Sequence, residues 1–384
     1  MCAYTHIYKE ILMNTKKAPA SARSRIYHYL YQNTGFCSRQ NLAQELSLSM
    51  PTVHQNLTGL MDAGLVCYSG EQQSTGGRKS NGLAVVPDAK TAIGIYITRR
   101  QIQFVACDLL LHELAVTERP FPDAARFLSE GRSIAAELEE FICESGLDRS
   151  RILGVTVTIP GIIDPGGTRL VLCPTMQLKN ISLEGLGAGV DYPFHIENNG
   201  TSGGNAEMFF WESHENLAYL FLEDGVGGML NIGGAPYNGD FHMSGEFGHM
   251  CVTPGGLRCN CGKLGCLEAY CSNWRISDNL GITLDEFFEG VNAHNAEYTM
   301  LWNDYLQHLA IAVNNIHSIL DCDVVLGGFM IRYLKPYFPM LKEYVASGGM
   351  EGAGAEFLHP GKVEEHPAPR GAALYYIRQF IEKI

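Results

Sequence analysis

One histidine and three cysteines in the second half of the chain are spaced as ligands of a metal ion. His249 is followed after nine residues by Cys259, which is separated by one residue from Cys261 and by six from Cys266. Imidazole and thiolate are preferred zinc ligands, and the intervening glycines let the backbone fold around a tetrahedral ion. Because four protein ligands leave no open position for water, the sequence predicts a structural Zn²⁺.

The other cysteines give alternatives to this ligand set. Cys251 and Cys271 lie close enough in sequence to substitute, and we rank both as bystanders. Four unligated side chains in a reducing compartment are the alternative to a metal site. The remaining cysteines are scattered among apolar neighbours and are read as buried thiols: Cys2, Cys37, Cys67, Cys107, Cys143, Cys173 and Cys322.

A second set of chemically useful side chains lies near the N-terminus, on the outer face of a predicted helix and at the tip of a predicted hairpin. Amide side chains can hydrogen-bond adenine edges in the major groove, and basic side chains at a glycine-rich tip can contact phosphates or a narrow minor groove. The candidate DNA contacts are Thr52, His54, Gln55 and Asn56 on the helix and Arg78 and Lys79 at the tip.

Three short helices and a hairpin would position these side chains. Apolar spacing predicts helices over 24–31 and 38–46, and a third that begins after Ser49, tolerates Pro51 in its first turn and ends at Gly64. Strands are predicted over 65–69 and 82–86. This is the order of a winged helix-turn-helix, which we assign to residues 1–88. A small helical domain used for protein contacts is the alternative.

Charge is distributed unevenly along the 384 residues. The net charge is −13, yet residues 1–90 carry nine basic against five acidic side chains. A basic N-terminal segment on an acidic body favours a small DNA-reading module joined to a larger domain. There is no run of 18 apolar residues and no signal-peptide pattern, so we expect a cytoplasmic protein without a membrane segment.

The body has the pattern of two related α/β halves with a cleft between them, where ligands commonly bind. In the first half, strands are predicted over 92–98, 102–108, 113–117 and 153–159, with a helix over 124–144. In the second half, strands are predicted over 216–223, 228–232 and 323–328, with a long helix over 301–320 and a closing helix over 371–381.

Several segments, in order, resemble the ROK family of repressors, open reading frames and sugar kinases. They are 158–164, 224–228, 245–250, 259–268 and 325–328, together with the Gly-Gly-Arg segment at 76–78, so the resemblance covers nearly the whole chain. It implies that an actin/hexokinase-like (RNase H-like) sensor domain occupies residues 89–384. Lobe one would comprise about 91–197 plus 368–384, and lobe two about 198–367.

The resemblance also implies a sugar site. Glu246, His249 and Glu268 match residues that hold sugar hydroxyls in the family's kinases, and Gly161 and Asn198 match positions that line the same pocket. Carboxylates accept hydrogen bonds from vicinal hydroxyls, and a zinc-bound imidazole is held rigid while its other nitrogen faces the ligand. Ordinary surface carboxylates are the alternative for the two glutamates.

Two departures from the family's kinases argue against phosphoryl transfer. The catalytic aspartate of Glu-Asn-Asp is replaced by Asn199, whose amide can hydrogen-bond a sugar hydroxyl but cannot accept its proton. The segment 96–101 has none of the glycines of the family's first phosphate loop. We therefore expect no enzymatic activity.

Together these features predict a sugar-responsive repressor of carbohydrate-metabolism genes. Its partners would be a double-stranded DNA operator, a sugar or sugar-phosphate effector, and further copies of the chain in a homodimer or dimer of dimers. An ATP-dependent sugar kinase with an N-terminal extension is the alternative, and a sensor that responds to a protein partner such as a transport component is a third possibility.

Overall fold

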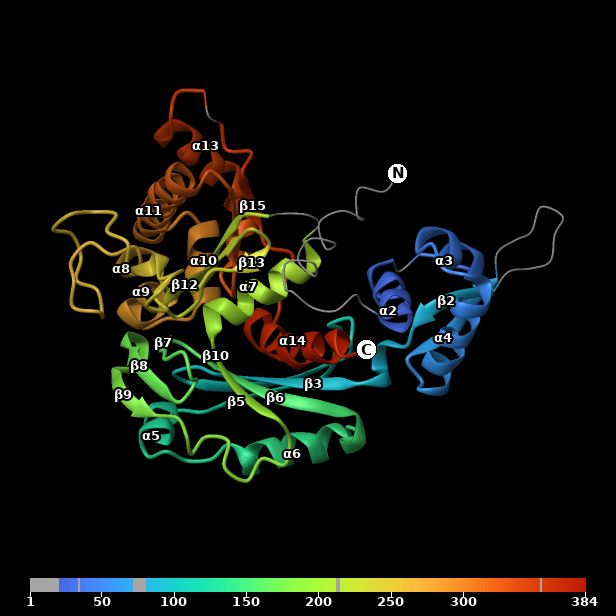
Figure 1. Cartoon of the computed structure of the whole chain (residues 1–384). Coiled ribbons are helices and arrows are strands. Elements are labelled where there is room, and N and C mark those ends of the chain that lie inside the picture. The colour runs from blue at the N-terminus through green and yellow to red at the C-terminus, as the bar shows by residue number, and fades with distance from the viewer. Residues whose placement is uncertain (1–20, 34, 72–80, 212–214, 353) are drawn as a thin grey trace.

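The N-terminal unit of the computed structural model contains three helices and one hairpin (Figure 1). The structure describes residues 21–33, 35–71, 81–211, 215–352 and 354–384, so Arg78 and Lys79 lie outside the described residues. The elements are α2 (Ala22–Gln32), α3 (Arg39–Glu45), α4 (Met50–Asp62), β1 (Val66–Glu71) and β2 (Asn81–Val85). All five predicted elements are present.

Local capping fixes the starts of the second and third helices. The Ser49 side chain accepts a hydrogen bond from the Thr52 amide, and Ser38 forms a capping box with Asn41. Such caps satisfy amides that have no partner within the helix. Buried apolar side chains from the three helices and the hairpin then form one core, including Ile26, Leu42, Val53, Leu57 and Leu83.

The first lobe is a five-stranded sheet covered by helices on both faces (Figure 1). Its strand order is β10-β6-β3-β4-β5, with β3, β4 and β5 antiparallel and β6 and β10 parallel to β3. The strands are β3 (Thr91–Ile97), β4 (Gln101–Cys107), β5 (Glu113–Pro120), β6 (Ile152–Ile159) and β10 (Phe194–Asn198). The helices are α5 (Ala124–Ser129) and α6 (Ala135–Ser145) on one face, and α7 (Asn199–Phe210) and α14 (Pro367–Glu382) on the other.

The second lobe repeats this topology. Its sheet order is β15-β14-β11-β12-β13, again with an antiparallel run followed by two parallel strands. The strands are β11 (Leu217–Leu222), β12 (Val226–Ile232), β13 (Ala235–Pro236), β14 (Asp323–Gly327) and β15 (Leu358–Pro360). The helices are α8 (Glu268–Cys271), α9 (Asn273–Leu280), α10 (Leu284–Asn292), α11 (Ala296–Leu320), α12 (Ile331–Leu334) and α13 (Phe338–Gly348). A small sheet, β7 (Ile162–Ile163), β8 (Arg169–Cys173) and β9 (Leu178–Ser182), extends the first lobe.

Three predicted helices differ from the structure. The single helix over 124–144 is wrong, because the chain breaks into α5 and α6 around Gly131, which has a left-handed φ of +65°. The long helix begins at Ala296 rather than 301, since Asn295 caps it. The closing helix begins at Pro367 rather than 371, with prolines in its first turn, where the missing N–H costs nothing. No helix among the described residues has both the length and the apolar character needed to cross a bilayer.

The contact between α7 and α14 gives a prediction about stability. A Cβ added to Gly371 of α14 would lie 1.6 Å from the Ser202 carbonyl oxygen of α7. Both groups belong to packed helix backbones, so we expect Gly371→Ala to lower the free energy of unfolding by about 3 kcal/mol. Urea unfolding measures this loss. Gly59→Ala in α4 is the control, since its Cβ would meet nothing closer than 3.6 Å. Equal stability of the two variants would contradict the prediction.

Candidate functional site

The four predicted metal ligands lie together in the second lobe. The ligand atoms of His249, Cys259, Cys261 and Cys266 all lie within 4.8 Å of one another. The Cys261 and Cys266 sulfurs are 3.7 Å apart, and the Cys259 sulfur is 3.7 Å from His249 Nδ1. A tetrahedral ion with metal–sulfur bonds of about 2.3 Å requires sulfurs about 3.8 Å apart. The cluster therefore fits a tetrahedral metal ion.

Glycines shape the loop that carries these ligands. Gly262 and Gly265 have φ values of +93° and +81°, and a Cβ on Gly265 would lie 1.9 Å from the Thr253 carbonyl oxygen. Cys251 is exposed, and the buried Cys271 thiol donates to the Tyr305 carbonyl at 3.4 Å. Neither belongs to the cluster formed by the described residues.

Two carboxylates adjoin the metal ligands. With Nδ1 of His249 facing Cys259, the opposite ring nitrogen, Nε2, lies 3.8 Å from Glu246 Oε2. Glu268 is buried, where one oxygen accepts from the Val226 amide at 3.1 Å and the other lies 3.6 Å from the Cys259 sulfur. Burial, with a smaller contribution from Glu268, raises the pKa of Glu246 to about 7. The three residues predicted to hold sugar hydroxyls are thus brought together at the Cys/His cluster.

The first lobe contributes Gly161 and Asn198. The Asn198 amide donates to the Gly161 carbonyl at 2.8 Å, while its oxygen accepts from the Thr201 amide and caps α7. Gly161 has a φ of +102°, and a Cβ there would lie 2.4 Å from the Leu172 carbonyl oxygen. Glycine is therefore required at this position.

Gly225 lies where the site residues of the second lobe approach the first lobe. A Cβ on Gly225 would lie 2.8 Å from a Glu268 carboxylate oxygen and 3.0 Å from the Thr175 methyl group. Thr175 belongs to the loop between β8 and β9 of the first lobe, whereas Glu268 begins α8 of the second. The absence of a side chain at Gly225 thus allows residues of both lobes to lie close together.

Asn199 has a partner that the sequence did not indicate. Its amide nitrogen donates to the Tyr96 hydroxyl at 3.0 Å, and both side chains are buried. Tyr96 lies on β3 yet packs in one cluster with Tyr219 and Phe221 of the second lobe. An isolated tyrosine in an otherwise aliphatic strand was the available signal for this contact. Neither position 96 nor position 199 carries a carboxylate.

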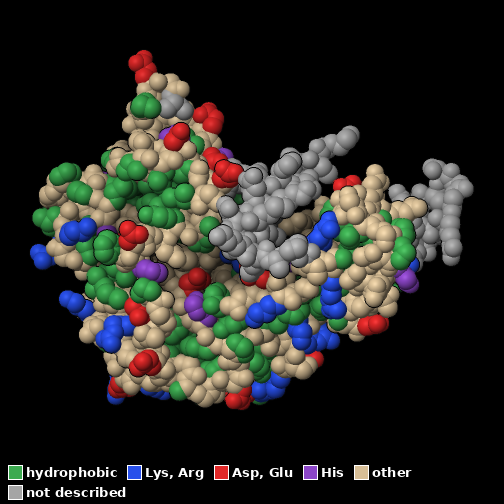
Figure 2. All heavy atoms as spheres, viewed as in Figure 1, with side chains coloured by type: hydrophobic (Ala, Val, Ile, Leu, Met, Phe, Trp, Pro, Cys, Tyr) green, Lys and Arg blue, Asp and Glu red, His purple; other side chains and the backbone are tan. Residues whose placement is uncertain are grey.

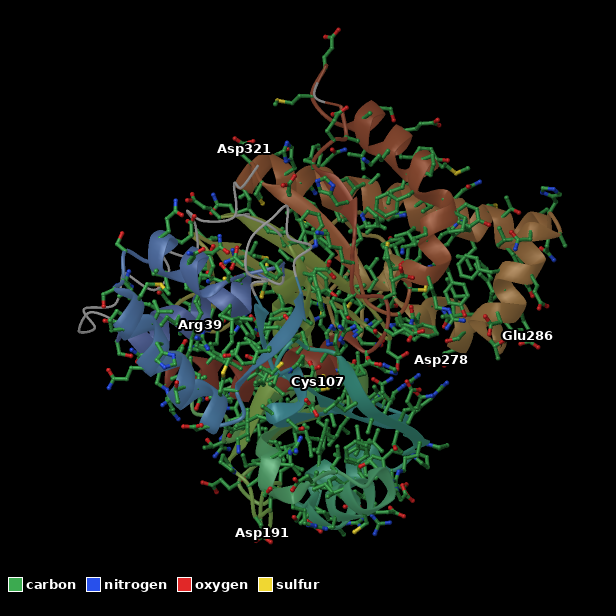
Figure 3. All side chains as sticks on the ribbon, turned by 90° about the vertical axis from the view of Figure 1, so that its right-hand side faces the viewer. Arg39, Cys107, Asp191, Asp278, Glu286 and Asp321 are labelled. Atoms are coloured by element: carbon green, nitrogen blue, oxygen red, sulfur yellow. The ribbon has the colours of Figure 1, made fainter. Side chains whose placement is uncertain are left out.

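The turn between β3 and β4 connects the lobes through an ion pair. Arg99 and Arg100 both contact the Asp278 carboxylate of α9, Arg100 at 2.5 Å. Figure 3 shows Asp278 at the edge of the second lobe, beside the end of the first-lobe hairpin. Although burial opposes it, hydrogen bonding to Arg99 and the charges of both arginines lower the pKa of Asp278. The turn, which the sequence predicts to lack a phosphate loop, thus holds two arginines that contact a carboxylate of the other lobe.

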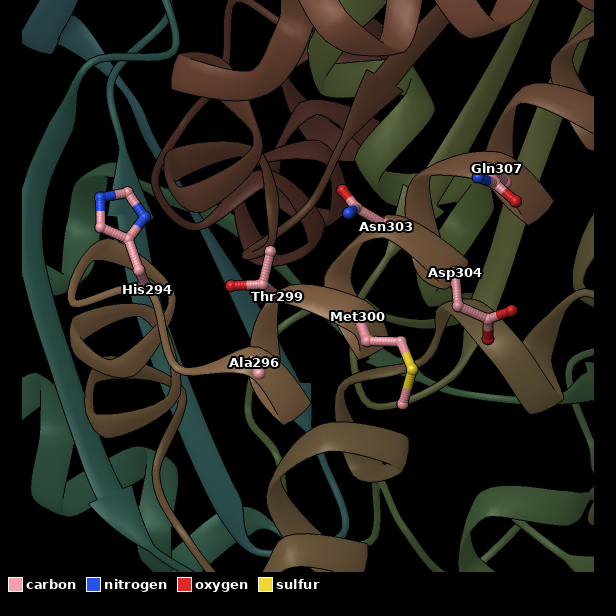
Figure 4. Close-up of a pocket in the computed structure, with 7 residues that line it drawn as sticks. All are labelled: His294, Ala296, Thr299, Met300, Asn303, Asp304 and Gln307. Atoms are coloured by element: carbon pink, nitrogen blue, oxygen red, sulfur yellow. The ribbon is translucent and has the colours of Figure 1, made fainter.

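A cleft of about 750 Å³ lies between this turn and the second lobe. Its carboxylates are Glu118, Glu223, Asp224, Asp285, Glu364 and Glu365, and its basic side chains are Arg100, Arg332 and His366. The face of the molecule drawn in Figure 2 carries acidic, basic and histidine side chains on both lobes. A separate hollow of about 500 Å³ on the outer side of α11 contains none of the predicted site residues (Figure 4).

Glu223 makes stability depend on pH. Burial raises its pKa to about 8, although one oxygen accepts from the Phe329 amide at 2.8 Å. The folded state therefore keeps a proton that the unfolded chain loses near pH 4.3. We expect the free energy of unfolding to fall by on the order of 1 kcal/mol per pH unit between about pH 5 and 8 through this group. Urea titrations at pH 5.5 and 8 measure this loss, and Glu223→Gln should not show it. An equal loss in the free energy of unfolding in wild type and variant would contradict the prediction.

The candidate base-contacting residues lie on α4, which is part of the N-terminal unit at one side of the molecule (Figure 1). His54 and Gln55 are exposed, whereas Thr52 and Asn56 are half-buried. The Asn56 amide donates to the Thr52 carbonyl at 2.8 Å, which leaves its oxygen available. Arg39 of α3 (Figure 3), which is not among the predicted contacts, donates to the Tyr68 hydroxyl of β1.

The molecule is thus a two-lobed α/β protein with a Cys/His cluster in its second lobe and an N-terminal three-helix unit. The ROK family model matches residues 93–379. Because this match spans more than half of the sequence, the chain belongs to the ROK family.

Relatives and solved structures agree with this membership. The chain is 27% identical to the xylose repressor of Bacillus subtilis (strain 168) over 250 residues, 63% of this chain and 64% of that one. It is 27% identical over 262 residues to the DNA-binding transcriptional dual regulator NagC of Escherichia coli (strain K12), again 64% of the relative and 67% of this chain. These alignments cover less than two thirds of each relative.

Two solved structures show the same fold. The crystal structure of a ROK family transcriptional regulator, a homologue of the E. coli MLC protein, superposes with a TM-score of 0.70 at 19% identity, covering 94% of this chain and 95% of that one. A ROK family glucokinase from Streptomyces griseus, in complex with glucose and AMPPNP, superposes with a TM-score of 0.62 at 20% identity, covering 74% and 98%.

Proposed function

We propose that the protein is a sugar-responsive, DNA-binding transcription regulator that represses carbohydrate-metabolism genes. The observation that carries the proposal is an N-terminal unit of three helices and a hairpin, consistent with a helix-turn-helix, joined to a two-lobed domain in which Glu246, His249 and Glu268 converge. The similarity to proteins named xylose repressor and NagC supports it. We assign DNA binding to residues 1–88 and sensing to residues 89–384.

In the proposed sensor, a structural zinc held by His249, Cys259, Cys261 and Cys266 orients the sugar-binding side chains. When bound, the metal would hold the loop rigid, and Glu268 follows closely after its last ligand, Cys266. Glu246 and Glu268 accept hydrogen bonds from hydroxyls of the sugar or sugar phosphate, and Gly161, Asn198 and Asn199 line the pocket from the first lobe.

Three observations support the absence of kinase activity. Asn199 has no titratable group and already donates to Tyr96. The β3–β4 turn is occupied by the contacts of Arg99 and Arg100 with Asp278. Carboxylates outnumber basic side chains in the adjoining cleft, which disfavours a polyphosphate. Sugar-dependent nucleotide consumption, assayed over a panel of hexoses and amino sugars, would contradict this part of the proposal.

In this function, α4 lies in the major groove of an operator read by paired copies of the chain. The base-facing residues are Thr52, His54, Gln55 and Asn56, with Arg78 and Lys79 at the hairpin tip. Homodimers or dimers of dimers follow from the two-fold symmetry of palindromic operators.

The test begins with selection of binding sites from a random duplex library by the full-length chain. We expect a palindromic consensus and a steep loss of affinity with salt. Gln55→Ala should relax the preference at one position of each half-site and weaken binding about 10- to 100-fold, while sugar binding stays unchanged. His28→Ala, at a half-buried position of α2 outside the proposed contacts, is the control. A chain that selects no duplex would overturn the assignment of a DNA-binding regulator.

A further inference from the structure

Helix α7 reaches from the sugar-site residues to the N-terminal unit. At its beginning, Asn198 caps the helix while bonded to Gly161, and Asn199 donates to Tyr96. At its end, the ring of Phe209 meets the ring of Tyr31 of α2 edge-to-face, with centroids 6.4 Å apart. A helix of 12 residues is about 18 Å long. One rigid element therefore contacts both regions.

The packing of α7 leaves little room for independent movement. A Cβ on Gly200 would lie 2.8 Å from the Gly228 amide nitrogen of β12, and one on Gly204 would lie 2.7 Å from Met229 Cβ. On another side, the backbone at Ser202 touches α14 at Gly371. Since closely packed interiors shift as units rather than deform continuously, displacement at one end of α7 carries the other end with it.

A buried carboxylate also ties α7 to the segment that joins the two lobes. Glu207 is fully buried and accepts hydrogen bonds from the backbone amides of Lys362 at 2.5 Å and Val363 at 3.1 Å. These residues follow β15 of the second lobe and precede α14, which packs on the first. A change in the angle between the lobes therefore acts directly on α7.

On the N-terminal side, Tyr31 connects α7 to the core beneath α4. Its hydroxyl donates to the Leu109 carbonyl of the first lobe at 2.6 Å, and its ring stacks on Tyr27 with centroids 6.3 Å apart. Tyr27 is fully buried in the same core as Val53 and Leu57 of α4. Cys107, labelled in Figure 3, belongs to this core where α2 meets the first lobe.

We infer that α7 transmits the occupation of the sugar site to the DNA-reading unit through the contact of Phe209 with Tyr31. The inference rests on the proposed function, since it requires both a sugar ligand and a DNA-binding head. Tyr31 and Phe209 are positioning residues, because they lie where α2 meets α7 and are not among the residues proposed to contact sugar or DNA.

Hydrogen exchange of the full-length chain, with and without sugar, tests the inference. Calorimetry first establishes which of D-xylose, D-glucose, N-acetyl-D-glucosamine and the 6-phosphates of the last two binds, and that sugar is then used at saturation. In the wild type, we expect the sugar to change exchange both in residues 199–210 and in residues 21–33. In Phe209→Leu, the sugar affinity and the change in 199–210 are retained, while the change in 21–33 is lost. Tyr31→Phe, which removes one hydrogen bond, should reduce that change.

Operator binding gives a second readout on the same variants. Saturating sugar should change the affinity of the wild type for its selected duplex about 5- to 150-fold, and that of Phe209→Leu less than about threefold. Phe121→Leu is the matched control, since Phe121 makes a similar edge-to-face contact with Phe127, 5.1 Å between centroids, away from α7. It should respond as the wild type does.

Each outcome separates the inference from the proposed function. If sugar changes the exchange of residues 21–33 and the operator affinity in Phe209→Leu as much as in the wild type, the route through this contact is overturned. The proposed sugar sensor is then unaffected. A wild type whose sugar response stops at 199–210 overturns the route equally. If none of the sugars binds the wild type, both the proposed sensor and the route that depends on it are overturned.

Discussion

Replacing Cys261 by alanine is expected to abolish stoichiometric zinc binding and to lower the free energy of unfolding by more than about 4 kcal/mol. This loss corresponds to a fall of about 10 °C in melting temperature. A structural zinc contributes its binding energy to folding, and three remaining ligands cannot close a tetrahedral site. Between His249 and Glu268 the chain forms no helix or strand, and its turns depend on left-handed glycines such as Gly262 and Gly265. Metal analysis and thermal unfolding of the full chain measure both effects.

The control for this variant is Cys251→Ser. Cys251 is an exposed cysteine of the same loop, yet it is not among the clustered ligands. It should keep one zinc per chain and nearly wild-type stability. Full zinc content in Cys261→Ala, or an equal loss in Cys251→Ser, would show that the ligand set is different.

Features with local signals were predictable from the sequence. Ser49 followed by Pro51 marked the start of α4, because a capping serine and an early proline act on the backbone beside them. The spacing of Cys259, Cys261 and Cys266 was equally informative, since a metal site in one loop leaves its pattern in a short stretch of sequence. The division of the body into two related α/β halves likewise followed from patterns along the chain, whereas the order of strands in each sheet was not predicted.

Contacts between distant segments were not predictable in this way. Arg99 meets Asp278, and Asn199 meets Tyr96, across more than 100 residues of sequence. The isolated Tyr96 in an aliphatic strand indicates an unusual side chain there, but the neighbouring sequence does not identify the partner of either pair, because the fold alone brings the residues together. The break at Gly131 was missed for another reason: the apolar pattern continues through both helices, and one glycine is tolerated in many helices.

Replacing Glu268 by glutamine is expected to weaken sugar binding about 10- to 150-fold, which corresponds to the 1.5–3 kcal/mol typical of a hydrogen bond to a charged group. The buried carboxylate already accepts from the Val226 amide with one oxygen. Glutamine can keep that bond through its carbonyl, but its NH₂ group then replaces the acceptor that a sugar hydroxyl requires. The fold should therefore survive while the ligand interaction is lost.

Calorimetric titration, together with zinc content and thermal unfolding, distinguishes that loss from damage to the loop. We expect Glu268→Gln to bind one zinc and to melt near the wild type without sugar, yet to lose the rise in melting temperature that a ligand of the folded state produces. Glu289→Gln on α10, an exposed position outside the cleft, makes the same chemical change and should bind sugar normally. Wild-type affinity in Glu268→Gln would mean that the hydroxyls are held elsewhere, and a loss of zinc would mean that this carboxylate acts through the metal loop.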